Sequence, residues 1–99
     1  MACKLIWSPL SRDDLRGIVI FIAQDSPRRA EAFGYRLIMQ VDVLQEHPEI
    51  GRVVPEHRDP KIREIIFKPY RIVYRHDSQK DLVEIIRVWH AARGFPELT

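Results

Sequence analysis

The chain has 99 residues, of which 45% are hydrophobic and 30% charged, and these proportions exclude both a two-domain protein and a disordered one. Sixteen basic residues against 14 acidic ones leave a formal net charge of +2, too small to indicate a nucleic-acid-binding protein. A single cysteine, Cys3, excludes an internal disulfide and indicates a reducing compartment. We therefore expect one domain, residues 1–99, in the cytoplasm, with no signal peptide and no membrane contact, since no stretch approaches the roughly 20 apolar residues of a membrane span.

The first half of the chain predicts a short strand followed by two helices. Residues 4–7 are apolar and aromatic, and Ser8-Pro9 then supplies a capping hydroxyl and a proline suited to the first helical turn. Ser26-Pro27 repeats this signal and divides the helical region in two. Apolar residues at spacings of three and four predict the buried faces, namely Leu15, Ile18, Val19 and Ile22 in the first helix and Ala30, Phe33, Leu37, Val41 and Leu44 in the second. The second helix is expected to run until Pro48, and the two helices to form a hairpin.

The second half predicts a loop and then three strands. Residues 49–60 carry glycine and two prolines among charged residues, which is typical of an exposed loop. The runs 62–67, 70–76 and 82–89 are rich in β-branched and aromatic residues, and the short links between them favour an antiparallel meander. The order β-α-α-β-β-β predicts an α+β fold, with the helical hairpin on one face of a small, mainly antiparallel sheet that the first strand joins.

Charge is distributed unevenly along the chain, and arginines recur in the predicted strands. Residues 51–99 hold ten of the 16 basic residues but only seven of the 14 acidic ones. Because side chains alternate along a strand, Arg71 and Arg75 share a face, Arg87 shares one with Ile85 and Trp89, and Arg63 shares one with Ile65 and Phe67. If these faces coincide, the side of the sheet away from the helices presents guanidinium groups suited to phosphate or to a partner's carboxylates. The alternative is that these arginines are only the solvated face of half-buried strands.

His90, at the end of the last predicted strand, is the best titratable candidate, because imidazole changes charge near neutral pH. The alternative interpretation is a structural group that is hydrogen-bonded at a strand end. The other histidines lack the spacing of metal ligands, so we expect no metal and no cofactor. Glycine-rich phosphate loops and hydrolase motifs are absent from the sequence.

Several motifs, in their order along the chain, resemble the RelE/ParE superfamily of toxins from bacterial type II toxin–antitoxin systems. The motifs are Trp7-Ser8-Pro9, Ile22-Ala23-Gln24-Asp25-Ser26-Pro27, Gly51-Arg52, Pro55-Glu56, Pro69-Tyr70-Arg71-Ile72-Val73-Tyr74-Arg75 and Ile85-Ile86-Arg87-Val88-Trp89-His90-Ala91-Ala92-Arg93. The resemblance covers the whole chain and implies the same helical hairpin against a small sheet. It also implies a cognate antitoxin as partner, with operator DNA bound only through that antitoxin and a role in plasmid stabilization.

The superfamily divides between ribosome-dependent mRNA endoribonucleases and poisons of DNA gyrase. On the RelE-like alternative, Arg71, His90 and Arg93 are the candidate catalytic residues of a metal-independent ribonuclease. The strand that offers a pair of lysines in RelE-like enzymes reads Ile62-Arg63-Glu64-Ile65 here, and this departure disfavours the ribonuclease. The ending Val-Trp-His-Ala-Ala-Arg looks closer to the ParE side, which implies a gyrase inhibitor that needs no catalytic groups. The residues predicted to bind target or antitoxin are Arg63, Tyr70, Arg71, Arg75, Arg87 and Trp89.

Overall fold

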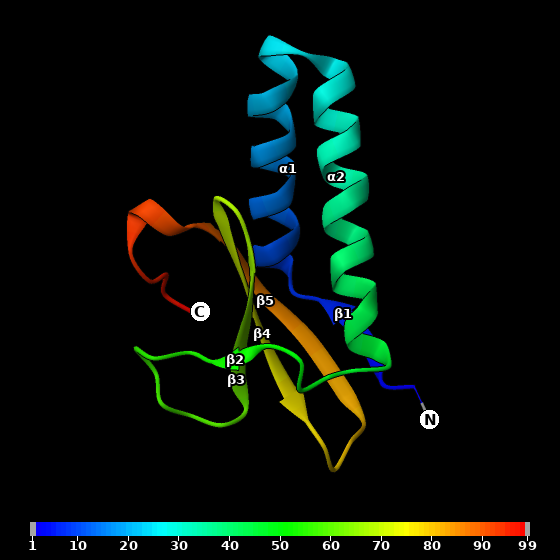
Figure 1. Ribbon diagram of the computed structural model, residues 1–99, viewed down its shortest axis with the longest axis vertical. Helices are drawn as coiled ribbons and strands as arrows, with labels where there is room; N and C mark the ends of the chain where they lie inside the picture. The colour runs from blue at the N-terminus through cyan, green and yellow to red at the C-terminus, as the bar shows by residue number, and fades with distance from the viewer. Residues whose placement is uncertain (1, 99) are drawn as a thin grey trace.

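The computed structural model describes residues 2–98, which form a five-stranded mixed sheet and a helical hairpin (Figure 1). The elements are β1 (Lys4–Trp7), α1 (Pro9–Asp25), α2 (Pro27–Asp42), the 3-10 turn η1 (Val43–Gln45), β2 (Arg52–Val53), β3 (Ile62–Phe67), β4 (Tyr70–Asp77), β5 (Leu82–His90) and the 3-10 turn η2 (Ala91–Arg93). The strand order is β1-β5-β4-β3-β2, with β1 parallel to β5 and the other pairs antiparallel. The predicted α+β architecture is confirmed.

Both helices begin where the serine-proline pairs predict. The Ser8 hydroxyl accepts a hydrogen bond from the Ser11 N–H at 3.0 Å, and the Ser26 hydroxyl accepts one from the Arg29 N–H at 3.2 Å. Each serine thus satisfies a backbone donor that the first helical turn leaves free. Within residues 2–98, neither helix combines the length and apolar character needed to cross a membrane.

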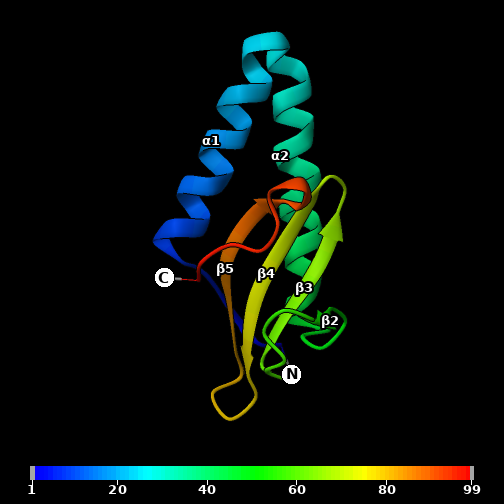
Figure 2. The same cartoon turned by 90° about the vertical axis from the view of Figure 1, so that its left-hand side faces the viewer.

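Apolar side chains cover both faces of the sheet. The larger core lies between the hairpin and the sheet, where Leu37 and Val41 of α2 pack against Ile72, Tyr74 and Ile85. The smaller core lies on the other face, which we call the far face, and consists of Val54, Ile62, Val73 and Ile86 with Phe95 and Leu98 packed against it. The chain after β5 therefore turns back across the far face, as the red segment in Figure 2 shows.

The structure corrects three expectations about the elements. The predicted 49–60 loop contains the two-residue strand β2, which pairs with β3 through Arg52 and Val53. The second helix ends at Asp42 and continues only as the η1 turn, before reaching Pro48. In β5 an extra residue at Ile86 interrupts the pairing with β4 between Val73 and Tyr74. Such a bulge shifts the alternation of side chains, and β4 and β5 each run one residue further than predicted.

The Tyr74 hydroxyl joins the large core to the loop that precedes β2. It accepts a hydrogen bond from the Gly51 N–H at 3.0 Å and donates one to the Pro48 carbonyl at 2.8 Å. Burial raises the pKa of Tyr74, so the hydroxyl stays protonated and keeps its donor. A Cβ at Gly51 would lie 2.6 Å from this hydroxyl, so the close approach requires glycine at that position.

Tyr74→Phe should lower the free energy of unfolding by about 1–3 kcal/mol, because it leaves the buried Gly51 N–H and the Pro48 carbonyl without a partner. Tyr35→Phe is the matched control, because Tyr35 is 67% exposed on α2. Urea unfolding of both variants measures the difference. Equal stabilities for the two variants would contradict a structural role for the Tyr74 hydroxyl.

Candidate functional site: the arginine face of the sheet

The predicted arginine face exists on the far face of the sheet, but its membership differs from the expectation. Arg71, Arg75 and Arg87 lie on this face with Trp89, since Arg71 pairs with Trp89 and Val73 pairs with Arg87. Arg63 is opposite Tyr74 and therefore lies on the face that the helices cover, so the expectation that it joins Arg71 is wrong. The expectation that Arg87 shares a face with Ile85 is also wrong, because the bulge at Ile86 separates them.

Arg71 is held by two carboxylates. Its Nε donates to Oε1 of Glu64 at 2.6 Å, while Nη1 and Nη2 donate to the two oxygens of Glu56 at 3.0 and 2.8 Å. Its Nη1 also donates to the Gly94 carbonyl at 3.3 Å, and the Phe95 ring lies 5.1 Å from Cζ. These hydrogen bonds raise the pKa of Arg71 further above its usual range. The Arg71 side chain is only 8% exposed, so its guanidinium is fully engaged inside the protein.

Glu64 is the buried centre of this ion network. Its side chain is 0% exposed, and Arg52 contributes a second cation, whose Nε donates to Oε2 at 2.7 Å. A buried carboxylate without partners is strongly unfavourable, and two guanidinium groups satisfy both of its oxygens. The network of Arg52, Glu64, Arg71 and Glu56 thus contains two positive and two negative charges and is neutral as a set.

Arg87 forms a second neutral pair, which joins the sheet to α1. Its Nε and Nη2 donate to the two oxygens of Asp14 at 2.8 and 2.9 Å, and its Nη1 donates to the Glu97 carbonyl at 2.7 Å. The Val88 N–H donates to the same carboxylate at 3.0 Å. The bidentate contact with Asp14 raises the pKa of Arg87. Residues 94–98 follow η2, and we call them the C-terminal segment. Carbonyl groups of this segment accept hydrogen bonds from both Arg71 and Arg87.

Two arginines lie close to the ring of Trp89. The Cζ atoms of Arg87 and Arg93 lie 4.7 and 3.9 Å from the centroid of its ring. Its Nε1 is buried without an acceptor, the only side-chain nitrogen or oxygen within residues 2–98 found in that state. Among these same residues, the Arg93 guanidinium takes part in no hydrogen bond or ion pair, so its donors are free, unlike those of Arg71 and Arg87.

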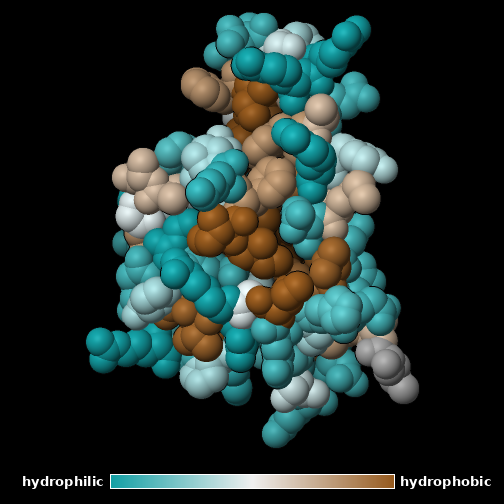
Figure 3. Space-filling view, viewed as in Figure 1, coloured by the Kyte–Doolittle hydropathy of each residue, from teal (hydrophilic) through white to brown (hydrophobic). Residues whose placement is uncertain are grey.

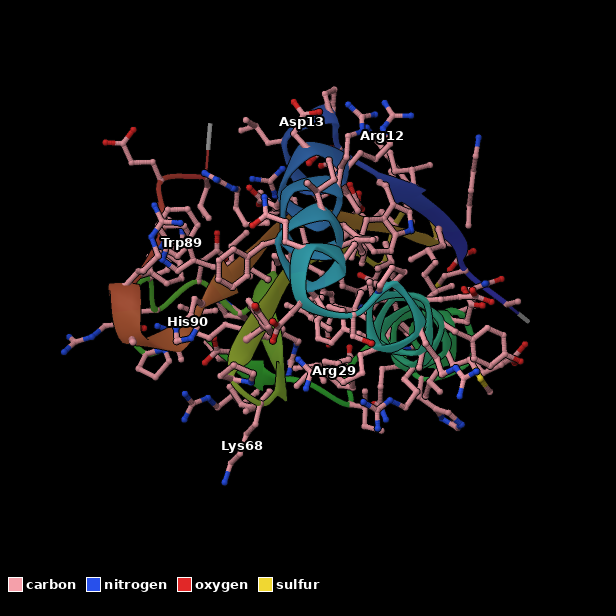
Figure 4. All side chains as sticks on the ribbon, turned by 90° about the horizontal axis from the view of Figure 1, so that it is seen from above. Arg12, Asp13, Arg29, Lys68, Trp89 and His90 are labelled. Carbon is pink, nitrogen blue, oxygen red and sulfur yellow. The ribbon has the colours of Figure 1, made fainter. Side chains whose placement is uncertain are left out.

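The three candidate catalytic residues do not converge on one centre. Nδ1 of His90 accepts a hydrogen bond from the Ala92 N–H at 3.1 Å and so caps η2, and its ring packs edge-on against Tyr70 at 5.3 Å. Figure 4 shows Trp89 and His90 at the end of β5, on the side of α1 that lies away from α2. Arg71 is enclosed by its glutamates, while Arg93 lies over Trp89. Among the described residues, the Arg93 guanidinium and the Nε2 of His90 have no hydrogen-bond partner, but they do not converge with Arg71 on one point.

The other predicted binding residues have local partners. Tyr70 belongs to an aromatic cluster on the helix-facing side, where its ring lies 5.4 Å from that of Phe33. Arg63 donates to the Gly51 carbonyl at 2.9 Å, and Arg75 pairs with Glu84 at 3.4 Å on the surface. Among the described residues, no group of three or more histidine, cysteine, aspartate or glutamate side chains is arranged to hold a metal ion.

Sequence reasoning missed the acidic partners Glu56 and Asp14. Glu64 gave a usable signal, because a carboxylate within an apolar strand indicates a buried cation nearby. The partners themselves come from a loop and from a helix, at separations of 15 and 73 residues from the arginines that they hold. The periodicity of residues within one segment cannot predict ion pairs between segments that are so far apart in the sequence.

Glu56→Gln should lower the free energy of unfolding at neutral pH and flatten its dependence on acid pH. The hydrogen bond from Arg71 lowers the pKa of Glu56 from 4.5 to about 2, so its stabilising contribution is complete above about 4.5 and disappears as the pH falls to about 2. Urea unfolding between pH 2 and 7 measures the effect. Glu31→Gln on the exposed surface of α2 is the control. Identical dependence of stability on pH for both variants would contradict the ion pair between Arg71 and Glu56.

Arg71→Ala should destabilise the protein by about 3 kcal/mol, because it leaves the buried Glu64 carboxylate with Arg52 as its only cation. Arg75→Ala should cost less than about 1 kcal/mol, because the Arg75 side chain is 49% exposed in its pair with Glu84. Denaturant unfolding compares the two. A loss of activity in Arg71→Ala is therefore informative only when its folded fraction is measured alongside.

A family model identifies the family of the chain, and solved structures share its fold. The model of the ParE toxin of the type II toxin–antitoxin system parDE matches residues 5–95. No curated protein sequence matches the chain. Three solved structures share the fold, each with about one fifth of its residues identical.

The structure of the chromosomal ParDE toxin–antitoxin system from P. aeruginosa superimposes with a TM-score of 0.73 at 21% identity, over 90% of this chain and 96% of that one. The toxin–antitoxin complex RelBE2 from Mycobacterium tuberculosis gives 0.61 at 21% identity, over 91% and 99%. A mutant of the E. coli toxin RelE in the free state gives 0.65 at 20% identity, over 95% and 88%. Since the family model spans almost the whole chain, this protein belongs to the ParE toxin family of type II toxin–antitoxin systems.

Proposed function

We propose that this toxin inhibits DNA gyrase by binding it, and that it does not cleave messenger RNA. The observation that carries the proposal is the neutralisation of Arg71 and Arg87 on the far face of the sheet. A metal-independent ribonuclease stabilises the negative charge that develops on the scissile phosphate, and it needs cations whose donors are free to do so. Here the donors of Arg71 and Arg87 are occupied by Glu56, Glu64 and Asp14, and within residues 2–98 Arg93 is left as a single cation without an acidic partner.

The C-terminal segment adds a second obstacle to cleavage at this face. The Gly94 and Glu97 carbonyls accept hydrogen bonds from Arg71 and Arg87, and Phe95 packs over the smaller core. A phosphate would have to displace both the segment and the carboxylates. A toxin that acts by binding requires no such rearrangement, and the implied mechanism is stabilisation of the covalent gyrase–DNA cleavage complex.

A cognate antitoxin is the expected partner, because toxin–antitoxin assemblies are among the structures with this fold. We propose that the antitoxin covers the apolar groove between α2 and β3, which holds about 250 Å³ and includes Val43, Ile50 and Ile66. These three residues are 41, 62 and 46% exposed. Figure 3 shows hydrophobic residues gathered at the centre of the side of the molecule that Figure 1 presents. Beyond Glu64, β3 has no strand on its outer side, so an extended segment can add to the sheet there.

The test is a gyrase supercoiling and DNA-cleavage assay with toxin freed of antitoxin, run beside a ribosome-dependent messenger-cleavage assay. We expect cleaved DNA to accumulate while the messenger stays intact, since gyrase poisoning needs no catalytic group on the toxin. Added antitoxin should restore supercoiling and serves as the control for specificity. Messenger cleavage with unaffected gyrase would establish the RelE-like alternative and overturn the proposal.

A further inference from the structure

A second groove lies on the other side of the helical hairpin, between α1 and the end of β5. It has a volume of about 690 Å³ and is lined on one wall by Asp13, Gly17 and Phe21 of α1. Tyr70, Val88, His90 and Arg93 are among the residues of the opposite wall. Seen from above in Figure 4, His90 marks this wall on the side of α1 that faces away from α2. We call it the α1–η2 groove, and it is separate from the apolar groove between α2 and β3.

Gly17 has no explanation within the fold. It lies in the middle of α1, where glycine stabilises a helix less than any residue except proline. A Cβ built at this position meets no atom within 4 Å, so no neighbour in the described chain requires the missing side chain. A glycine exposed on a helix surface allows the backbone of another helix to approach closely. The open position therefore points to a partner that crosses α1 here.

Phe21 lies one turn after Gly17 on the same side of α1, and it is 71% exposed, more than the other large hydrophobic residues of the described chain. An exposed aromatic ring beside a concave surface is typical of the anchors that dominate protein interfaces. Gly17 and Phe21 together form a small apolar contact surface that the toxin's own core does not use.

The charges around the groove indicate the chemistry of the partner. The Arg93 guanidinium lies over the Trp89 ring, 3.9 Å from its centroid, and makes no hydrogen bond within residues 2–98, so its planar set of donors suits a carboxylate. The α1 wall carries Asp13, whose side chain is 69% exposed and pairs loosely with Arg16 at 3.6 Å. Asp13 would repel a polyanion, so the mixed charges and apolar floor fit a protein helix better than a nucleic-acid backbone.

We propose that the α1–η2 groove binds an α-helix of the gyrase subunit that the toxin inhibits. This assignment rests on the proposed function. The helix crosses α1 at Gly17, packs an apolar side chain against Phe21 and presents a carboxylate to Arg93. The antitoxin takes the apolar groove between α2 and β3 instead, where extended apolar surface adjoins an open sheet edge.

Gly17→Ala tests whether a helix of gyrase approaches α1 closely at this position. The stability of the toxin and its inhibition of gyrase should change in opposite directions. The substitution should raise Tm by roughly 2–8 °C, since alanine favours the helix. It should weaken inhibition of gyrase by at least about tenfold, since the added methyl group separates the two backbones. Antitoxin affinity should not change.

Gly34→Ala is the matched control, because Gly34 lies in α2, where a Cβ would make ordinary contact with Val19 at 3.7 Å. It should leave inhibition of gyrase unchanged. Arg93→Gln should also weaken inhibition, while Arg36→Gln on the exposed surface of α2 should not. Arg36→Gln should retain the wild-type Tm, whereas Arg93→Gln loses its contact with the Trp89 ring and should lower Tm by only a few degrees.

Two results would overturn the assignment of the groove. If Gly17→Ala inhibits gyrase as strongly as wild type, no helix crosses α1 at this position. If the variant loses antitoxin affinity and keeps inhibition, the groove binds the antitoxin. A wild-type toxin without effect on gyrase is a different outcome, because it refutes the proposed function itself and the assignment together with it.

Discussion

The ion network around Glu64 is the constraint on which the far face of the sheet depends. A carboxylate that is fully buried on β3 requires cations, and Arg71 on β4 and Arg52 on β2 supply them. Arg71 in turn holds Glu56, which anchors the loop between β2 and β3. One buried charge thus ties together three strands and a loop. It also removes Arg71 from the set of groups that a ligand can reach.

Within the superfamily, a shared fold does not by itself identify the function of a toxin. The fold is shared with both ParE and RelE toxins, at TM-scores of 0.73 and 0.65, so similarity of architecture does not distinguish binding from catalysis. For this chain, the proposal of binding rather than cleavage rests on the pairing of its arginine side chains. The donors of Arg71 are held by carboxylates within the fold, whereas Arg93 has no acceptor within residues 2–98. Arginines in and beside the far face therefore differ in how far the fold itself uses their donors.

The surfaces left open by the fold lie on opposite sides of the helical hairpin, one beside α1 and the other beside α2. The apolar groove between α2 and β3 combines exposed hydrophobic residues with an unpaired strand edge, which suits a segment that orders on binding. The α1–η2 groove combines charges of both signs with an aromatic side chain, which suits a folded surface. A toxin that must recognise both an antitoxin and a target can use two such sites without sharing residues between them.

The sequence by itself determined both helices, four of the five strands and their order. Local signals were sufficient for the Ser8 and Ser26 caps and for the apolar faces of the helices, because these depend on residues a few positions apart. The family was also readable, because motifs in a constant order run through the whole chain. The strand β2 was missed, since two residues are too few for alternation to be recognised.

Only the tertiary structure decided which arginines share a face and which of them are neutralised. The bulge at Ile86 reverses the alternation expected for Arg87, and the pairing of β3 with β4 places Arg63 on the helix side. Glu56 and Asp14 reach their arginines across 15 and 73 residues. Strand register and long-range ion pairs arise from packing between distant segments, and for that reason no local pattern in the sequence contains them.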